Sequence, residues 1–308
     1  MKMPVLSAPA IRKLRTGVYF LLIAIAIALI VIWWPVLVRI WREQALTFAG
    51  TVIVMICGTY VQARNFFVFL EVEHSVRQWR FTRIWALSAL ANYVAPLQPG
   101  IAVRVAWLAH RGVNVSEALL ATWRQLVVSI WIATLGLGIG LLLTGDPRGR
   151  WPGVALVVVG VAVFALRKIG LRMLDRLARP RWVASRKELL RRAATGITGS
   201  GVIGVIAQYV LGTLVLYWVY SRFGADIGVG QALILACLIY LSSVIAVLPG
   251  NLGITEAIYM LGGHGFELSL TTSGALAILI RVAHIAANLL IALTNFQRDE
   301  GGLGTKRL

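Results

Sequence analysis

Long apolar runs separated by short basic segments constrain this chain more than any other feature of its sequence. A helix needs about 20 apolar residues to cross the hydrocarbon core of a bilayer. Runs of that length lie near 17–38, 45–70, 117–143, 151–168, 197–221 and 271–295. The first run exceeds the apolar core of a signal peptide and is not followed by a clear small-residue cleavage site, which indicates a retained first span. We therefore expect about six full transmembrane helices.

The basic residues predict how these helices are oriented. The chain carries a net charge of +18 although only 14% of its residues are charged and 59% are hydrophobic. A nucleic-acid-binding domain would place such charge in a polar segment, whereas here it lies between apolar runs, so no nucleic-acid partner is expected. Placing both termini in the cytoplasm puts most Lys and Arg on the cytoplasmic side, as the positive-inside rule requires. This pattern predicts a multi-pass protein of a bacterial inner (plasma) membrane.

Two further apolar stretches, 84–103 and 231–262, are interrupted midway by proline and glycine. The interruptions are Pro96, Pro99 and Gly100 in the first stretch, and Pro249, Gly250 and Gly253 in the second. Both stretches are interpreted as re-entrant helical hairpins; the alternative is that the prolines only kink packed helices. Because the two hairpins enter from opposite sides, they predict an inverted repeat, the architecture of many transporters.

The predicted fold is an all-α polytopic membrane protein that forms a single integral membrane domain over residues 1–308. Its parts are a first repeat over 45–143, a basic cytoplasmic connector over 167–196 and a second repeat over 197–295. The segment Arg167–Arg192 predicts an amphipathic surface helix or helix pair broken at Pro180, or only a topological anchor. A GxxxG spacing at Gly136–Gly140 permits a homodimer without requiring one.

Three arginines fall inside predicted spans, where an unpartnered guanidinium is costly. Arg124 and Arg281 occupy equivalent places in the two repeats, and Arg64 lies near enough to the inner interface to extend toward it. A guanidinium matches the geometry of a phosphate, so a lipid headgroup is a natural ligand. The alternative is a buried ion pair, Arg281 with Glu256 or Arg124 with Glu117.

Other polar residues complete the predicted binding site. On the last span Arg281, His284, Asn288 and Asn295 share one helical face; His284 is either a proton carrier or a structural histidine. In the second span, Thr59, Gln62, Arg64 and Asn65 are polar enough to line a cavity. The helices that start at the breaks offer backbone N–H groups to anions. The side-chain amides of Asn92, Gln98 and Asn251 lie beside the breaks and either bond to these backbone groups or contact a headgroup. The predicted substrate-binding residues are Arg124, Arg281, Arg104, Asn92, Gln98, Asn251, Glu256, His284, Asn288 and Arg64.

Catalytic motifs are missing from the sequence. There is no Walker loop, HExxH, GxSxG or zinc-ligand spacing, and the acidic residues include no obvious catalytic pair. We therefore expect a protein that is not an enzyme and that uses no metal or cofactor.

The two breaks resemble the motifs of the lysylphosphatidylglycerol synthase transmembrane family, also called the flippase-domain family. The first motif, N-Y-x-x-P…P-G-x-x-x-R, reads Asn92-Tyr93-Val94-Ala95-Pro96…Pro99-Gly100-Ile101-Ala102-Val103-Arg104. The second motif, L-P-G-x-x-G-x-x-E, reads Leu248-Pro249-Gly250-Asn251-Leu252-Gly253-Ile254-Thr255-Glu256. The chain departs from the family pattern at Ile101, Trp123 and Thr255, where the family often carries charged residues. These departures bear on any proton coupling and on the family's usual headgroup preference.

The resemblance implies the lipid-translocating part of the family, because the chain ends soon after its last span and lacks the soluble aminoacyltransferase domain. We therefore expect a lipid flippase that moves an anionic phospholipid or a polyprenyl-phosphate-linked sugar, with the headgroup phosphate bound by intramembrane arginines. The alternative is a membrane scaffold that transports nothing and presents lipid to a partner glycosyltransferase or another lipid-modifying enzyme.

Overall fold

The computed structural model describes residues 42–70, 78–94, 98–177, 196–244, 251 and 253–294, together with the isolated residues 35, 38 and 191; in the helix Pro147–Leu177 it describes no side chain for 164 or 167–177. The chain divides into two compact units, Met1–Phe48 and Ala49–Leu308. The arrangement below concerns the second unit. The predicted span 17–38 lies almost entirely outside the described residues. That residues 1–308 form a single integral membrane domain stays a prediction.

All regular secondary structure in the described part of the chain is helical. The first described helix is Arg42–Leu70. It is followed by α2 (Gln78–Val94), α3 (Pro99–Ala109), α4 (Val115–Leu143), α5 (Pro147–Leu177), α7 (Gly199–Arg222), α8 (Val229–Val244), α9 (Ile254–Gly265) and α10 (Leu270–Leu293). Arg42–Leu70, α4, α7 and α10 are long and apolar enough to cross a membrane. The chain is thus a multi-pass membrane protein, and four of the predicted spans coincide with these helices to within three residues.

The predicted span 151–168 lies within α5. The helix continues without a break through 168 to Leu177, so the first residues of the predicted basic connector extend this helix. Arg and Lys have good helix propensity, and nothing in the sequence between 166 and 177 is a helix breaker except Gly170. Most of the predicted connector beyond Leu177, including Pro180, lies outside the described residues.

Side-chain caps mark where three of the long helices begin. Asn114 accepts a hydrogen bond from the backbone N–H of Ser116 at the start of α4, at 3.0 Å. Thr198 caps α7 and Ser269 caps α10 in the same manner. Short polar side chains satisfy backbone donors that have no partner in the first turn, which is why they are preferred at this position. These caps separate the long helices from the segments before them.

Helix breaks occur in both stretches that carry Pro and Gly. Between α2 and α3, Gln98 has a left-handed backbone (φ 53°) and Pro99 begins α3. Between α8 and α9, Asn251 and Gly253 also have positive φ angles, of 57° and 86°. The short helices of each stretch pack against one another, α2 on α3 and α8 on α9. The breaks are therefore confirmed as helix ends, whereas the re-entrant path through a bilayer stays a prediction.

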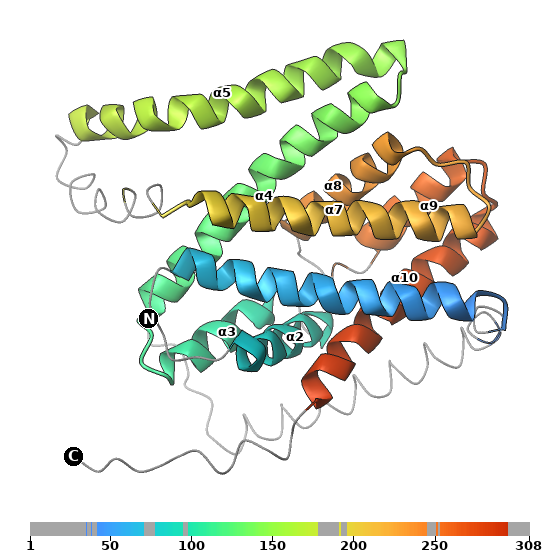
Figure 1. Cartoon of the computed structure of the whole chain (residues 1–308), viewed down its shortest axis with the longest axis horizontal. Helices are drawn as coiled ribbons and strands as arrows, with labels where there is room; N and C mark the ends of the chain where they lie inside the picture. The colour runs from blue at the N-terminus through green and yellow to red at the C-terminus, as the bar shows by residue number, and fades with distance from the viewer. Residues whose placement is uncertain are drawn as a thin grey trace, which may run out of the picture. The chain divides into compact units, whose positions relative to one another are not determined.

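The two predicted repeats have the same order of helices. Each contains a long helix, two short helices and a second long helix: Arg42–Leu70, α2, α3 and α4, then α7, α8, α9 and α10. In Figure 1 the segment 49–70 runs from right to left and α7 from left to right, while α4 rises toward the upper right and α10 descends toward the lower left. Corresponding long helices thus run in opposite senses in this view.

Packing between the two predicted repeats is reciprocal. The last helix of the first repeat, α4, packs on α8, and the last helix of the second repeat, α10, packs on α2. The Gly136–Gly140 face of α4 lies against α8, because a Cβ at these glycines would meet Cys237 and Ile234. Small residues allow such close helix contact. The glycines of the GxxxG spacing therefore pack against α8 of the same chain. The homodimer stays a prediction, and this spacing does not support it.

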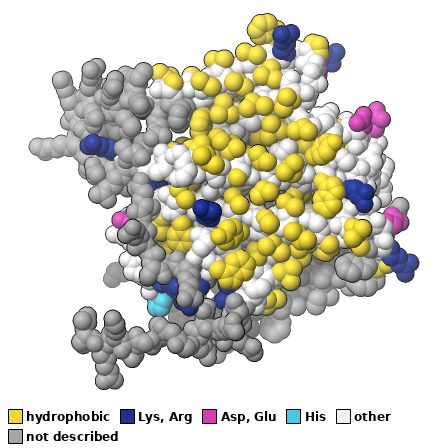
Figure 2. Space-filling model, viewed as in Figure 1, with side chains coloured by type: hydrophobic (Ala, Val, Ile, Leu, Met, Phe, Trp, Pro, Cys, Tyr) yellow, Lys and Arg dark blue, Asp and Glu magenta, His cyan; other side chains and the backbone are white. Residues whose placement is uncertain are grey.

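An aromatic cluster fills the core between the segment 49–70 and α2. Phe66 stacks on Phe81 with ring centroids 5.2 Å apart, and Phe67 lies 4.5 Å from Phe81. Phe66, Phe69 and Phe81 are completely buried. The outer surface is also apolar: Figure 2 shows a face on which hydrophobic side chains predominate and charged ones lie mostly toward the edges. Such a surface suits contact with lipid.

Candidate functional site

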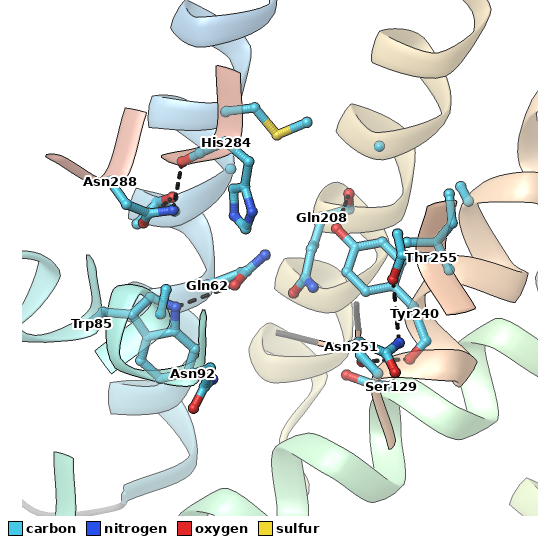
Figure 3. A pocket seen from close by; sticks show the side chains of 18 of the residues that line it. Gln62, Trp85, Asn92, Ser129, Gln208, Tyr240, Asn251, Thr255, His284 and Asn288 are labelled. Carbon is cyan, nitrogen blue, oxygen red and sulfur yellow. Dashed lines mark hydrogen bonds between the residues drawn. The ribbon is translucent and has the colours of Figure 1, made fainter. Parts of the chain in front are cut away.

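A cavity of about 460 Å³ lies among the helices of the second compact unit. Its walls come from the first described helix, α2, α3, α4, α7, α8, α9 and α10, and from both helix breaks. Figure 3 shows Gln62, Trp85 and Asn92 on one side of the open space and Gln208 and Asn251 on the other. Both predicted repeats therefore contribute residues to one site.

The lining is largely apolar, and its polar side chains carry few charges. Most of these polar residues bear an amide or a hydroxyl group: Thr59, Gln62, Ser88, Asn92, Tyr93, Gln98, Thr122, Gln125, Ser129, Gln208, Tyr240, Ser243, Asn251, Thr255, Tyr259 and Asn288. The cationic lining residues are Arg104 and Arg281, with His284 beside them. Among the described residues, no Asp or Glu lines the cavity. The site is thus suited to an anion or a neutral polar group.

Arg104 is the lining cation that no acidic group neutralises in the described structure. It lies in α3, where its guanidinium stacks over the Trp85 ring at 3.9 Å from the centroid. Its Nε is buried and has no hydrogen-bond partner among the described residues. Cation–π stacking holds the guanidinium without using its N–H donors. Arg104 can therefore offer these donors to an anion in the cavity.

Arg281 is held by an acidic partner. Its Nε donates to Glu256 Oε1 at 2.6 Å, and the two side chains form an ion pair. Glu256 also caps α9, because its Oε2 accepts from the N–H of Gly253 at 2.8 Å. The ion pair considered for Arg281 from the sequence is present, although Arg281 still lines the cavity and lies 5.0 Å from the Tyr93 ring centroid.

Hydrogen bonds connect His284 and Asn288 of α10 with two other helices. The Tyr93 hydroxyl and His284 Nδ1 share a hydrogen bond of 2.7 Å. Asn288 donates to the carbonyl of His284 at 2.8 Å, and Thr59 donates to Asn288 Oδ1 at 3.4 Å. His284 and Asn288 thus lie on one face of α10, as predicted, and they face the cavity. The contacts connect α10 with α2 and with the first described helix.

Amide side chains satisfy or bridge the backbone at both breaks. Asn92 Oδ1 accepts from Gly100 N–H at 2.8 Å, and a Cβ at Gly100 would overlap the carbonyl of Ser88. Asn251 Nδ2 donates to Ser242 Oγ at 2.9 Å. Gln98 donates to the carbonyl of Ser243 at 2.6 Å and so connects the first break to the end of α8. The N–H groups of Gly100 and Gly253 are therefore occupied within the protein.

Arg124 and Arg64 lie outside the described lining of the cavity. Arg124 is buried (3% exposed), donates from Nη1 to the carbonyl of Phe69 at 2.8 Å, and packs so closely on Gly196 that a Cβ there would overlap it. Arg64 is exposed. Neither is among the described residues that line the cavity. The structure thus places Arg104 and Arg281, rather than Arg124 and Arg281, at one site.

Several lining residues were not among the predicted site residues. Gln125 follows Arg124 on α4, and Gln208 is a single amide in the apolar helix α7. An amide in a membrane helix is costly unless it has a partner or faces water, so these two positions carried a usable signal. Ser129 and Tyr240 carried none, because short hydroxyls and tyrosines are common in packed helices. Of the four polar residues of 45–70 that were predicted to line a cavity, Thr59 and Gln62 are among the described lining residues, whereas Arg64 and Asn65 are not.

Comparison with known proteins identifies a family. The family model described as the lysylphosphatidylglycerol synthase TM region matches residues 21–292. Neither the curated proteins nor the solved structures include a significant match.

Proposed function

Because this chain belongs to the lysylphosphatidylglycerol synthase TM region family, we propose that it is a lipid flippase whose cavity binds the phosphate of an anionic lipid. The lipid is an anionic phospholipid or a polyprenyl-phosphate-linked lipid. In this proposal the protein resides in a bacterial inner membrane with both termini in the cytoplasm, and it performs no covalent chemistry.

The observation that carries this proposal is Arg104. A guanidinium in an apolar helix is costly unless it is compensated, yet in the described structure Arg104 lies over two aromatic rings and has no acidic partner. A phosphate would supply the missing anion and accept several N–H bonds at once. Arg281 adds a second guanidinium to the same cavity, although Glu256 balances its charge.

The arrangement of the repeats supports transport. Two sets of helices in the same order, with corresponding long helices running in opposite senses (Figure 1), are what an inverted repeat would produce. Helix breaks from both sets meet at the cavity, where Gln98 bonds to the end of α8. Binding sites of inverted-repeat transporters lie at such breaks. The acyl or prenyl chains would stay in the surrounding lipid.

Reconstitution into liposomes tests the proposal. Acyl-labelled fluorescent phosphatidylglycerol and phosphatidylcholine would be added, and their transfer between leaflets followed by leaflet-selective quenching. We expect phosphatidylglycerol to move faster, and Arg104→Gln to slow it about tenfold or more, since a hydrogen bond to a charged group contributes about 1.5–3 kcal/mol.

Arg111→Gln is the matched control. Arg111 also stacks on a tryptophan, Trp107, at 3.9 Å from the ring centroid, but it is exposed and does not line the cavity. Its loss should leave transport within about twofold. Wild-type protein that is folded yet moves no lipid would refute the flippase and favour a scaffold that presents lipid to a glycosyltransferase or another enzyme.

A further inference from the structure

The cavity holds two buried acceptors that lack donors. Gln208 and Asn251 are each 6% exposed, and Gln208 Oε1 and Asn251 Oδ1 have no hydrogen-bond partner among the described residues. Leaving a buried acceptor unpaired costs about 1–3 kcal/mol. Both residues line the same side of the cavity (Figure 3). A complementary ligand would therefore bring hydrogen-bond donors to this side, and a phosphodiester alone has none.

The opposite side presents a donor. Gln62 Oε1 accepts from Trp85 Nε1 at 3.2 Å, which turns the amide nitrogen of Gln62 into the open space in Figure 3. Donors and acceptors thus face one another across the cavity. Hydroxyl groups fit such a lining because each one both donates and accepts.

Two kinds of ligand group commonly donate hydrogen bonds, hydroxyls and ammonium groups. The charge of the cavity lining decides between them. Glu256 balances the charge of Arg281, but the described lining itself contains no carboxylate and gives Arg104 no acidic partner, so an aminoacyl or ethanolamine ammonium would meet an unbalanced like charge at Arg104. The volume of about 460 Å³ is in the range of small-molecule sites, and a bare phosphate would leave most of it empty.

We infer that the cavity takes a headgroup in which a phosphate is joined to an uncharged polyhydroxyl group, such as a sugar or an inositol. The phosphate lies at Arg104, and the hydroxyls lie between Gln62 on one side and Gln208 and Asn251 on the other. Trp85 contacts both Arg104 and Gln62, so the two parts of the site are adjacent. This inference rests on the proposed function, of which it specifies the substrate class.

Three acyl-labelled lipids test it in the liposome assay: phosphatidylinositol, phosphatidic acid and lysylphosphatidylglycerol. They offer hydroxyls with phosphate, phosphate alone, and two ammonium groups with phosphate. We expect phosphatidylinositol to move about tenfold faster than lysylphosphatidylglycerol, the effect of about one charge-assisted contact. Native mass spectrometry of the purified full chain with the same lipids measures headgroup preference in binding without requiring transport.

Variants at Gln208 sharpen the test. Gln208→Leu should slow phosphatidylinositol about fivefold and phosphatidic acid less than about twofold, because it removes only the contact with a hydroxyl. Gln208→Glu adds a carboxylate to the cavity and should shift the preference about tenfold toward lysylphosphatidylglycerol. Gln231→Glu is the matched control: Gln231 lies in α8, accepts from Gly228 N–H at 2.6 Å and does not line the cavity, so the preference should not change.

The outcomes separate the inference from the proposed function. Preferential binding of phosphatidylinositol without transport of any lipid would support the inference and refute the flippase. Equal binding of the three lipids by wild type would overturn the inference, even if all three are transported. A preference that Gln208→Glu leaves unchanged in folded protein would overturn it as well.

Discussion

Removing the carboxylate of Glu256 should destabilise the protein through two contacts that can be separated. Breaking a fully buried ion pair by removing one partner costs about 3–5 kcal/mol. The side chains of Arg281 and Glu256 are 14% and 25% exposed, so water moderates the effect, and we expect a loss of about 2–3 kcal/mol for Glu256→Gln. Glu256→Ala also removes the acceptor for Gly253 N–H and should cost about 1 kcal/mol more.

A double-mutant cycle with Arg281→Ala measures the pair directly. The free energy of unfolding would be obtained by titrating mixed micelles with SDS and following tryptophan fluorescence. We expect a coupling energy of about 1.5–3 kcal/mol between positions 256 and 281. Glu267→Gln, at an exposed carboxylate, is the control and should change the free energy by about 0.5 kcal/mol or less. A coupling energy below about 0.5 kcal/mol would refute the structural role of this pair.

Two further substitutions examine the first break and the buried arginine. Gly100→Ala should destabilise by about 1–3 kcal/mol in the same titration, because its Cβ would overlap the carbonyl of Ser88 and the side chain of Asn92; an unchanged midpoint would contradict this close contact. Arg124→Met should cost about 1–3 kcal/mol, because the Phe69 carbonyl loses its donor, while folded protein keeps its transport rate in liposomes. Loss of transport by folded Arg124→Met would contradict this and indicate that Arg124 takes part in substrate binding.

The helices and breaks were predictable because their causes are local. Apolar length defines a span, and proline or a glycine with positive φ separates one helix from the next: Pro99 is the first residue of α3, and Gly253 is the N-cap of α9. The end of α5 carries no such local mark near 167. The change there from apolar to basic residues marks a change of solvent, and the helix continues to Leu177.

The partners of buried groups were harder to predict, because they depend on contacts between distant segments. Arg124 and Arg281 look alike in sequence, but one donates to the carbonyl of Phe69 and the other pairs with Glu256. The contact between Tyr93 and His284 joins residues 191 positions apart. Arg104 was predicted to bind substrate, but only the structure shows that a tryptophan, and no carboxylate among the described residues, accompanies it.

The reciprocal packing of α4 on α8 and of α10 on α2 has a consequence for how the cavity could change shape. The two halves of the sequence cannot separate as independent bodies without breaking both of these interfaces. A movement that preserved them would carry α8 with α4 and α2 with α10, so each mobile body would combine helices from both halves. Cutting the chain between the repeats would likewise yield two fragments that each expose a surface shaped for the other.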